Sequence, residues 1–183
     1  RFHPNLPLPR NKTKPIKYTQ PAKSSCVPYI SPLMDWGDLP ADADICITEG
    51  EIKSIIACKH GIPTIGLGGV WNFNSKNGLG EQSFVLEGFP LEGRRVNIVF
   101  DSDAVVNDSV RKAEFALARQ LSLRGARVFI ARLPDDQGGV KVGMDDFILR
   151  NGVDDLKQII ADASEFAEAV SLHKLNQEIT LVV

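Results

Sequence analysis

Two acidic residues stand two positions apart, directly after an apolar run of the sequence. The run "VNIVF" ends at Phe100 and is followed by Asp101 and Asp103. Side chains two positions apart on an extended strand point to the same side, so these carboxylates can face one place if the chain stays extended. Like charges this close repel each other unless a cation lies between them or water reaches them. The spacing alone leaves two readings open: a cation-binding pair at the end of a buried strand, or acids of a solvated turn or helix cap.

Further acidic residues follow other apolar runs. Glu49 ends "ICITE", and Asp145 and Asp146 follow "ARVFIARL" and a polar turn. Ligands of open parallel sheets bind beyond the carboxyl ends of the strands, so these acids can meet if their strands are neighbours. Carboxylate oxygens suit Mg²⁺ or Mn²⁺, which also bind phosphate oxygens. The implied chemistry is phosphoryl transfer, with Glu49 either a metal ligand or a general acid or base.

The acids can meet only if β-strands place them at one edge of a sheet, and four apolar runs are candidate strands. We expect strands within residues 45–49, 62–67, 94–100 and 126–133. The Gly- and Asn-rich segment 68–82 is a long connection, and connections of that length in compact domains are usually functional. Within it, Trp71 and Phe73 either pin the segment against the core or stack on bases.

Helical patterns lie between and after these strands. The first follows Gly50, which is expected to permit a tight turn, and its apolar stripe is Ile52, Ile55, Ile56 and Lys59. The second has one face made of Val110, Ala113, Leu117 and Leu121, with Asn107 or Asp108 as its cap and Gly125 as its stop. Segment 144–166 predicts one short and one longer helix. Strands that alternate with helices predict an α/β fold with a mainly parallel, Rossmann-like central sheet flanked by helices.

Length and composition limit the protein class. The 183 residues suffice for one domain plus an arm. With 21 Lys and Arg against 23 Asp and Glu, there is no overall basic field, so nucleic acid has to be met locally or through a metal. The three cysteines form no CxxC pair, which predicts reduced thiols, a cytoplasmic location and no structural zinc. No run is long enough to span a membrane, and the start at Arg1 leads us to expect a piece of a longer protein.

Three regions follow from these patterns. Residues 1–44 are expected to be an extended arm rich in Pro and Lys, with short strands at 16–19 and 27–30. Residues 45–172 are the expected catalytic domain, and residues 173–183 are a tail or a last strand. The lysines of the arm either line a path for nucleic acid or are simply solvated; they are Lys12, Lys14, Lys17 and Lys23.

Taken together, the motifs resemble the Toprim domain, which bacterial primases, topoisomerases, OLD-type nucleases and small recombination proteins share. The resemblance lies in a strand ending in "TEG", a helix and second strand, and a hydrophobic strand ending in "DSD". The later "RLPDDQGGVKVGMDDF" resembles the primase-type ending. The stretch "ITEGEIKSIIACKHGIPTIGLGGVWNF" is similar to the Toprim-like domain of phage, plasmid and mobile-element replication proteins, which is often fused to a helicase. The resemblance is strongest over residues 45–163.

The resemblance implies a role for each acid. Glu49 corresponds to the glutamate of the family, Asp101 and Asp103 to its metal-binding DxD, and Asp145 to a later acid. These four would hold Mg²⁺ or Mn²⁺, and the first three would be catalytic. Gly50 and Asp146 are secondary candidates for residues of this site.

The chain departs from the primase pattern at two positions. Bacterial primases have acids where this chain has Lys53 and Gly143, so the number of metals in primases does not transfer directly. Lys53 could instead bring a positive charge to a phosphate. Lys53, Lys141 and Arg111 are therefore candidate contacts to phosphate or nucleic acid.

The leading functional hypothesis is the primase-type Toprim module of a mobile-element replication protein. Its partners would be a single-stranded DNA template, nucleotides and a helicase or other replication domain of the parent chain. A Toprim nuclease shares the same acids, and a degenerate, non-catalytic binding module is the alternative favoured by Lys53 and Gly143. "VFDSD" also resembles the nucleophile strand of HAD-type phosphatases, but that reading leaves Glu49 without a role and meets Ala104 and Val105 where those enzymes have Gly and Thr.

Overall fold

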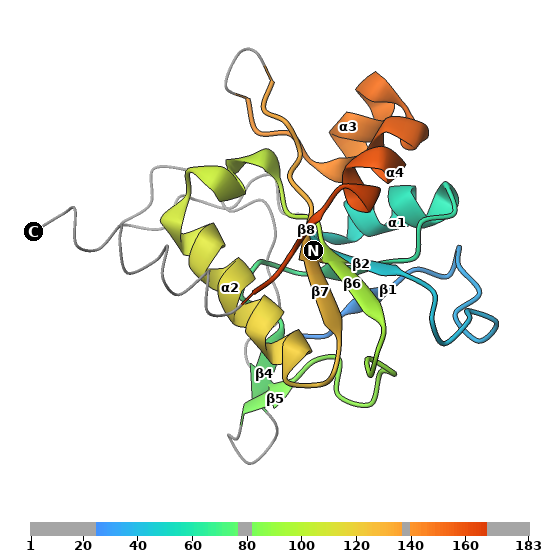
Figure 1. Ribbon diagram of the computed structural model, residues 1–183, viewed down its shortest axis with the longest axis vertical. Coiled ribbons are helices and arrows are strands. Elements are labelled where there is room, and N and C mark those ends of the chain that lie inside the picture. The colour runs from blue at the N-terminus through green and yellow to red at the C-terminus, as the bar shows by residue number, and fades with distance from the viewer. Residues whose placement is uncertain (1–24, 77–81, 137–139, 168–183) are drawn as a thin grey trace, which may run out of the picture.

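A six-stranded sheet forms the centre of the protein. The computed structural model describes residues 25–76, 82–136 and 140–167. The strands, in sheet order, are β1 (Tyr29–Ile30), β3 (Thr64–Leu67), β2 (Ile45–Glu49), β6 (Arg95–Ile98), β7 (Arg127–Ile130) and β8 (Ser164–Glu165) (Figure 1). The four inner strands are parallel to one another, and the two edge strands pair antiparallel to their neighbours. The prediction of an α/β fold with a mainly parallel sheet is confirmed.

Helices cover both faces of this sheet. The helices are α1 (Glu51–Lys59), the short 3₁₀ helix η1 (Ser102–Val105), α2 (Asp108–Ser122), α3 (Met144–Asn151) and α4 (Val153–Ala161). Helix α2 lies on one face, whereas α1, α3 and α4 lie on the other (Figure 1). Among the described residues, no helix is long and apolar enough to cross a membrane.

The alternation of side chains along β2 divides the core into two clusters. Ile45 and Ile47 belong to the cluster under α2, together with Leu117 of that helix. Cys46, between them, belongs to the cluster under α1, α3 and α4, which includes Leu156. Because both faces are covered, the inner strands are apolar on both sides, as buried parallel strands usually are.

Helix α2 forms as its sequence predicts. The four residues of its predicted apolar face are all buried; they are Val110, Ala113, Leu117 and Leu121. The side chain of Asn107 caps the helix by accepting hydrogen bonds from the backbone N–H groups of Ser109 and Val110. Of the two proposed caps, Asn107 is therefore the cap, and Asp108 is the first helical residue.

The predicted apolar stripe of α1 is correct only in part, since Ile56 packs against the cluster under α1, α3 and α4. The buried residues of this helix are Ser54, Ala57 and Cys58, whereas Ile52 is 60% exposed. The cause is the close approach of the helix to β3. A Cβ added at Gly66 would lie 3.2 Å from the Cβ of Ser54, so only small side chains fit between helix and strand.

Two other segments differ from expectation. The connection 68–82 contains β4 (Asn74–Lys76), which pairs antiparallel with β5 (Gln82–Phe84), a strand that begins at the last residue of the connection. Segment 144–166 forms two helices of 8 and 9 residues, divided at Gly152 with φ 93°, and then β8. The predicted strand at 27–30 is seen as the two-residue β1, whereas 16–19 and 173–183 lie outside the described residues.

Candidate functional site

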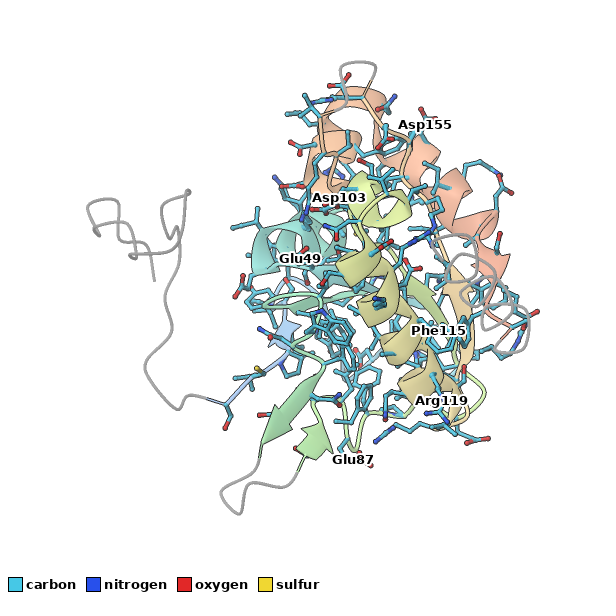
Figure 2. The ribbon with its side chains drawn as sticks, turned by 90° about the vertical axis from the view of Figure 1, so that its left-hand side faces the viewer. Glu49, Glu87, Asp103, Phe115, Arg119 and Asp155 are labelled. Carbon is cyan, nitrogen blue, oxygen red and sulfur yellow. The ribbon has the colours of Figure 1, made fainter. Side chains whose placement is uncertain are left out.

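The sheet brings the predicted acids to one edge. Strands β2 and β6 are parallel neighbours, with Ile45 opposite Val96 and Ile47 opposite Ile98. Glu49 ends β2, and Asp101 follows β6 by three residues, so both leave the sheet at its carboxyl edge. Figure 2 shows Glu49 and Asp103 near each other. The neighbouring strands on which the predicted convergence depended are therefore present.

The backbone at the two aspartates differs from the extended chain assumed for them. Asp101 is extended, with φ −63° and ψ 157°, but the chain turns into η1 at Ser102, so Asp103 lies in a 3₁₀ turn. The two carboxylates therefore face one place because the chain turns, and not because side chains alternate along a strand. The same turn leads into Asn107, the cap of α2.

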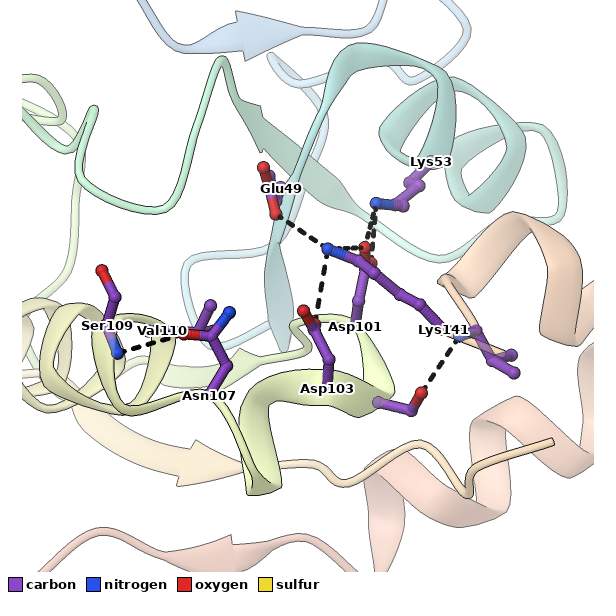
Figure 3. A network of polar contacts seen from close by, with 10 residues as sticks. Glu49, Lys53, Asp101, Asp103, Asn107, Ser109, Val110 and Lys141 are labelled. Atoms are coloured by element: carbon purple, nitrogen blue, oxygen red, sulfur yellow. Dashed lines mark hydrogen bonds and ion pairs between the residues drawn. The ribbon is translucent and has the colours of Figure 1, made fainter. Parts of the chain in front are cut away.

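One ammonium group contacts all three carboxylates. The Nζ of Lys141 lies 2.9 Å from Asp101 Oδ2, 3.4 Å from Asp103 Oδ1 and 3.8 Å from Glu49 Oε2 (Figure 3). Burial alone would lower the pKa of Lys141, but its hydrogen bond with Asp101 and the charges of the three acids together raise this pKa above the ordinary 10.5. The predicted convergence of the three acids is confirmed, while their catalytic roles stay predictions.

A second lysine binds the most buried acid. The Nζ of Lys53, on α1, lies 2.6 Å from Oδ1 and 2.8 Å from Oδ2 of Asp101 (Figure 3). The side chain of Asp101 is 4% exposed and that of Lys53 is 18% exposed. The carboxylate of Asp101 is thus enclosed between two ammonium groups, those of Lys53 and Lys141.

The two departures from the primase pattern are in contact with each other. A Cβ added at Gly143 would lie 2.4 Å from Cε of Lys53. The backbone at Gly143 has φ −97°, which any residue can adopt, so space and not conformation requires glycine here. Gly143 therefore makes room for the lysine that holds Asp101.

Asp145 lies beside this group, and Asp146 does not. A Cβ at Gly143 would be 2.7 Å from Asp145 Oδ1 and 3.2 Å from Asp101 Oδ1, so both oxygens border the same small space. Asp145 Oδ1 is buried and has no hydrogen-bond partner among the described residues. Asp146 is exposed in the first turn of α3, where its charge suits the helix dipole.

Ser102 is a site residue that sequence reasoning missed. This side chain, 2% exposed, lies between the two aspartates. Its backbone N–H donates to the carbonyl of Val142, and its Oγ accepts from the N–H of Val142, both at 3.0 Å. These two hydrogen bonds fix the backbone next to Lys141, and the side chain of Lys141 extends from there to the three acids. Nothing in the sequence connects Ser102 with a segment forty positions later, so only the fold reveals this contact.

The carboxylate oxygens of Glu49, Asp101 and Asp103 are ligands of the type that a hard divalent cation prefers. Three carboxylates face one point, and a cation, the ammonium of Lys141, already stands there. The spacing suits an ammonium group, because within the described residues no three Asp, Glu, His or Cys side chains are close enough to share one metal ion. Binding of Mg²⁺ or Mn²⁺ therefore requires Lys141 to move away, and the metal stays a prediction.

The other candidate residues lie around this centre. Gly50, with φ 98°, makes the expected tight turn and donates its N–H to the carbonyl of Leu67. Arg111 pairs with Asp108 in the first turn of α2, and its contact with phosphate stays a prediction. The arm lysines 12, 14, 17 and 23 lie outside the described residues.

The two aromatic residues of segment 68–82 differ in exposure. Phe73 is buried at 1% exposure and pins the segment to the core. Trp71 is 48% exposed, and its indole N–H donates to the Oγ of Ser109 at 3.3 Å. Ser109 lies in the first turn of α2, beside the site (Figure 3). The exposed indole ring is therefore held by a hydrogen bond to the first turn of α2.

Fold and site together define an α/β protein with an acid and lysine cluster at the carboxyl edge of its sheet. The sequence model of a domain of unknown function, DUF3854, matches residues 36–155, and the chain belongs to this family. The matching model is not a Toprim model, so Toprim membership stays a proposal. A comparison with curated proteins finds no match.

Among solved structures, the chain is similar to the Aquifex aeolicus primase, in a crystal structure of its zinc-binding and RNA polymerase domains. The two are 23% identical, with a TM-score of 0.49. The similarity covers 67% of this chain and 26% of the primase chain, so it spans about a quarter of that protein's crystallised length.

Proposed function

We propose that this chain is the primase-type Toprim module of a mobile-element DNA replication protein, and that it catalyses divalent-metal-dependent nucleotidyl transfer. The observation that carries the proposal is that Glu49, Asp101 and Asp103 all contact the ammonium group of Lys141 at the carboxyl edge of the sheet. The resemblance of the "TEG", "DSD" and "GMDDF" motifs to Toprim primases supports the primase type. The proposed partners are single-stranded DNA, nucleotides and a helicase or other replication domain, in the cytoplasm.

In this proposal Glu49, Asp101 and Asp103 hold Mg²⁺ or Mn²⁺, with Asp145 nearby. The bound metal would neutralise phosphate charge and activate the attacking hydroxyl. Lys53 holds the carboxylate of Asp101 in position. The carboxylate of Glu49, whose side chain is 32% exposed, is accessible to substrate and can accept the proton of that hydroxyl.

Primer synthesis on a single-stranded template tests the proposal. The chain is incubated with template DNA, labelled ribonucleotides or deoxynucleotides, and Mg²⁺ or Mn²⁺. We expect short, metal-dependent products that Asp103→Ala abolishes, because this partly exposed acid can be removed without opening the core. Asp155→Ala, which removes an exposed acid of α4, is the matched control and should leave synthesis unchanged. Metal-dependent loss of the template strand instead of new products would point to the nuclease.

A non-catalytic binding module is the second candidate. It is favoured by the lysines, because Asp101 is already neutralised without any metal. This function predicts that labelled single-stranded DNA binds equally well in EDTA and in Mg²⁺, as measured by fluorescence anisotropy. Equal binding together with a failure to make products would favour the binding module over the primase.

A further inference from the structure

The two lysines of the site are held in different ways. Lys53 extends from α1 and is 18% exposed, and within the described part of the chain its ammonium pairs with Asp101 alone, through both carboxylate oxygens at 2.6 and 2.8 Å. Lys141 is 46% exposed, and its ammonium lies between three carboxylates at 2.9 to 3.8 Å. The buried contact of Lys53 with two oxygens of one carboxylate is harder to replace than the exposed contact of Lys141, which is shared among three carboxylates. Water can solvate the ammonium of Lys141 when it leaves its exposed position.

We propose that Lys141 is an exchangeable counter-ion of the acid cluster, which a divalent metal ion displaces, whereas Lys53 is a permanent one. This inference rests on the proposed metal binding. Three features support the exchange. They are the formal charge of the acid cluster, the anchoring of the backbone next to Lys141 and the exposure of the Lys141 side chain.

Charge counting favours the exchange of one lysine. Glu49, Asp101 and Asp103 contribute three formal negative charges, and Lys53 cancels one of them. When the ammonium of Lys141 withdraws, these three acids keep two uncompensated negative charges, which one divalent ion neutralises. The neighbouring Asp145 adds a further negative charge that favours the ion. If both lysines stayed, the cluster would have a single net negative charge and no open position at its centre.

The backbone allows the ammonium to move without a change in the fold. Val142, next to Lys141, is fixed to Ser102 by two hydrogen bonds of 3.0 Å. The flexible four-carbon stem of Lys141 can rotate, because its half-exposed position gives it room to do so. The carboxylate side chains, which are not close enough to share one metal ion while the ammonium lies between them, would then close on the metal. After rotation the same ammonium stays close to the acids, where it can meet the phosphate of a nucleotide.

Amine labelling with mass spectrometry tests the displacement directly. The whole chain is treated with a limiting amount of acetic anhydride, with and without saturating Mn²⁺, and acetylation is measured at each lysine. We expect Mn²⁺ to increase acetylation of Lys141 about threefold or more, because its amine is no longer held by three carboxylates. Lys53 should remain protected, and Lys157, exposed on α4 and paired only with Asp154, is the internal control that should not change.

Calorimetric titration of Mn²⁺ provides the second measurement. Lys141→Met should bind Mn²⁺ about tenfold more tightly than the wild type if the ammonium occupies the site about nine-tenths of the time. Lys157→Met, which loses the same charge at a lysine paired with Asp154 of α4, should bind as the wild type does. Circular dichroism shows whether each variant is folded.

The outcomes separate this inference from the proposed function. Metal binding with unchanged or reduced acetylation of Lys141 would overturn the exchange and leave metal dependence intact. Equal or weaker Mn²⁺ binding by a folded Lys141→Met would do the same, because a competitor cannot be removed without a gain in affinity. No Mn²⁺ binding by either protein would overturn both the exchange and the metal-dependent function.

Discussion

Asp101 has the most constrained environment of the site acids. Its side chain is 4% exposed, and ammonium groups of Lys53 and Lys141 lie within 3 Å of its oxygens. A buried charge is costly unless it is paired, and removal of one partner leaves the other charge uncompensated. Asp103, in contrast, is 27% exposed and contacts only Lys141 among the lysines described above, at 3.4 Å. The two aspartates of the DxD motif should therefore contribute very differently to stability.

Asparagine substitutions at the two aspartates test this difference. We expect Asp101→Asn to lower the free energy of unfolding by about 3 kcal/mol, because it leaves Lys53 partly buried without a charge partner. We expect Asp103→Asn to lower it by less than about 1 kcal/mol, since water can still solvate Lys141. Urea unfolding at neutral pH measures both. Equal losses would show that burial of the Lys53 pair is not the source of the stability.

The contact between Gly143 and Lys53 leads to a second prediction. A methyl group at position 143 would lie 2.4 Å from Lys53 Cε, so the lysine would have to leave its place beside Asp101. We expect Gly143→Ala to lower the free energy of unfolding by about 1 to 2 kcal/mol. In a Lys53→Ala background the same change should cost clearly less, because the clashing atoms are gone.

A double-mutant cycle of the wild type, the two single variants and the pair, each unfolded in urea, measures this coupling. Additive losses would mean that Gly143 is required for a reason other than the space taken by Lys53. The nearby Oδ1 of Asp145 is the other atom that such a methyl group would meet, at 2.7 Å.

At the scale of elements, the packing of α1 on β3 positions both Glu49 and Lys53. The carbonyl of Gly50 would lie 2.8 Å from a Cβ at Gly66, and Ser54 is similarly close. The turn at Gly50 and the closeness of the helix therefore depend on one missing methyl group. Overpacking at such a contact moves the helix, because a dense interior has no free volume to absorb it.

Gly66→Ala tests this dependence. We expect a loss of about 2 kcal/mol in the free energy of unfolding, and weaker Mn²⁺ binding, because α1 and the Glu49 turn shift away from the other acids. Gly37→Ala is the matched control, since the nearest atom to its Cβ is Asp35 Oδ1 at 3.5 Å, an ordinary contact. Urea unfolding and calorimetry provide the two readouts. A Gly66→Ala protein as stable as the control would show that the helix can move without cost.

The elements also show which features can be predicted from sequence. The apolar face of α2 could be predicted from hydrophobic periodicity, because that helix is long and buries large side chains on one face. The predicted stripe of α1 fails at Ile52 because a helix packed against glycine buries its small residues, and hydrophobic periodicity cannot detect such closeness. The parallel sheet could be predicted, whereas the pairing of β2 with β6, which brings Glu49 and Asp101 together, is only a condition of the prediction and is shown by the structure.

The remaining site contacts could not be predicted, because they join segments far apart in the sequence. The bonds between Ser102 and Val142 and the reach of Lys141 to Glu49 depend on how a loop after β7 crosses the end of β6. No local propensity or spacing encodes such a crossing. For the same reason the sequence offers Lys141 only as a candidate contact to phosphate, whereas the fold shows its contact with the three acids.

At the scale of the whole molecule, the sheet separates two apolar clusters and presents one polar edge. Glu49 and Asp103 lie together in Figure 2, whereas Glu87 lies toward the opposite end. The carboxyl edge combines acids and lysines with an exposed tryptophan, Trp71, held by Ser109. A strand of nucleic acid whose phosphates reach the acid cluster would therefore pass close to this ring.

Trp71 gives a direct measurement of that approach, because the chain has only two tryptophans. The other, Trp36, packs edge-on against Phe89 with ring centroids 6.2 Å apart, and Trp36→Phe leaves Trp71 as the only indole reporter. We expect its fluorescence to be quenched when a single-stranded oligothymidylate binds, since bases stack on exposed aromatic rings. Trp71→Ala should weaken binding about tenfold, which corresponds to the ~1 to 3 kcal/mol of one stacking contact. Trp36→Phe should bind as the wild type does in fluorescence anisotropy. If the labelled oligonucleotide binds but the Trp71 emission stays constant, the strand does not cross this part of the edge.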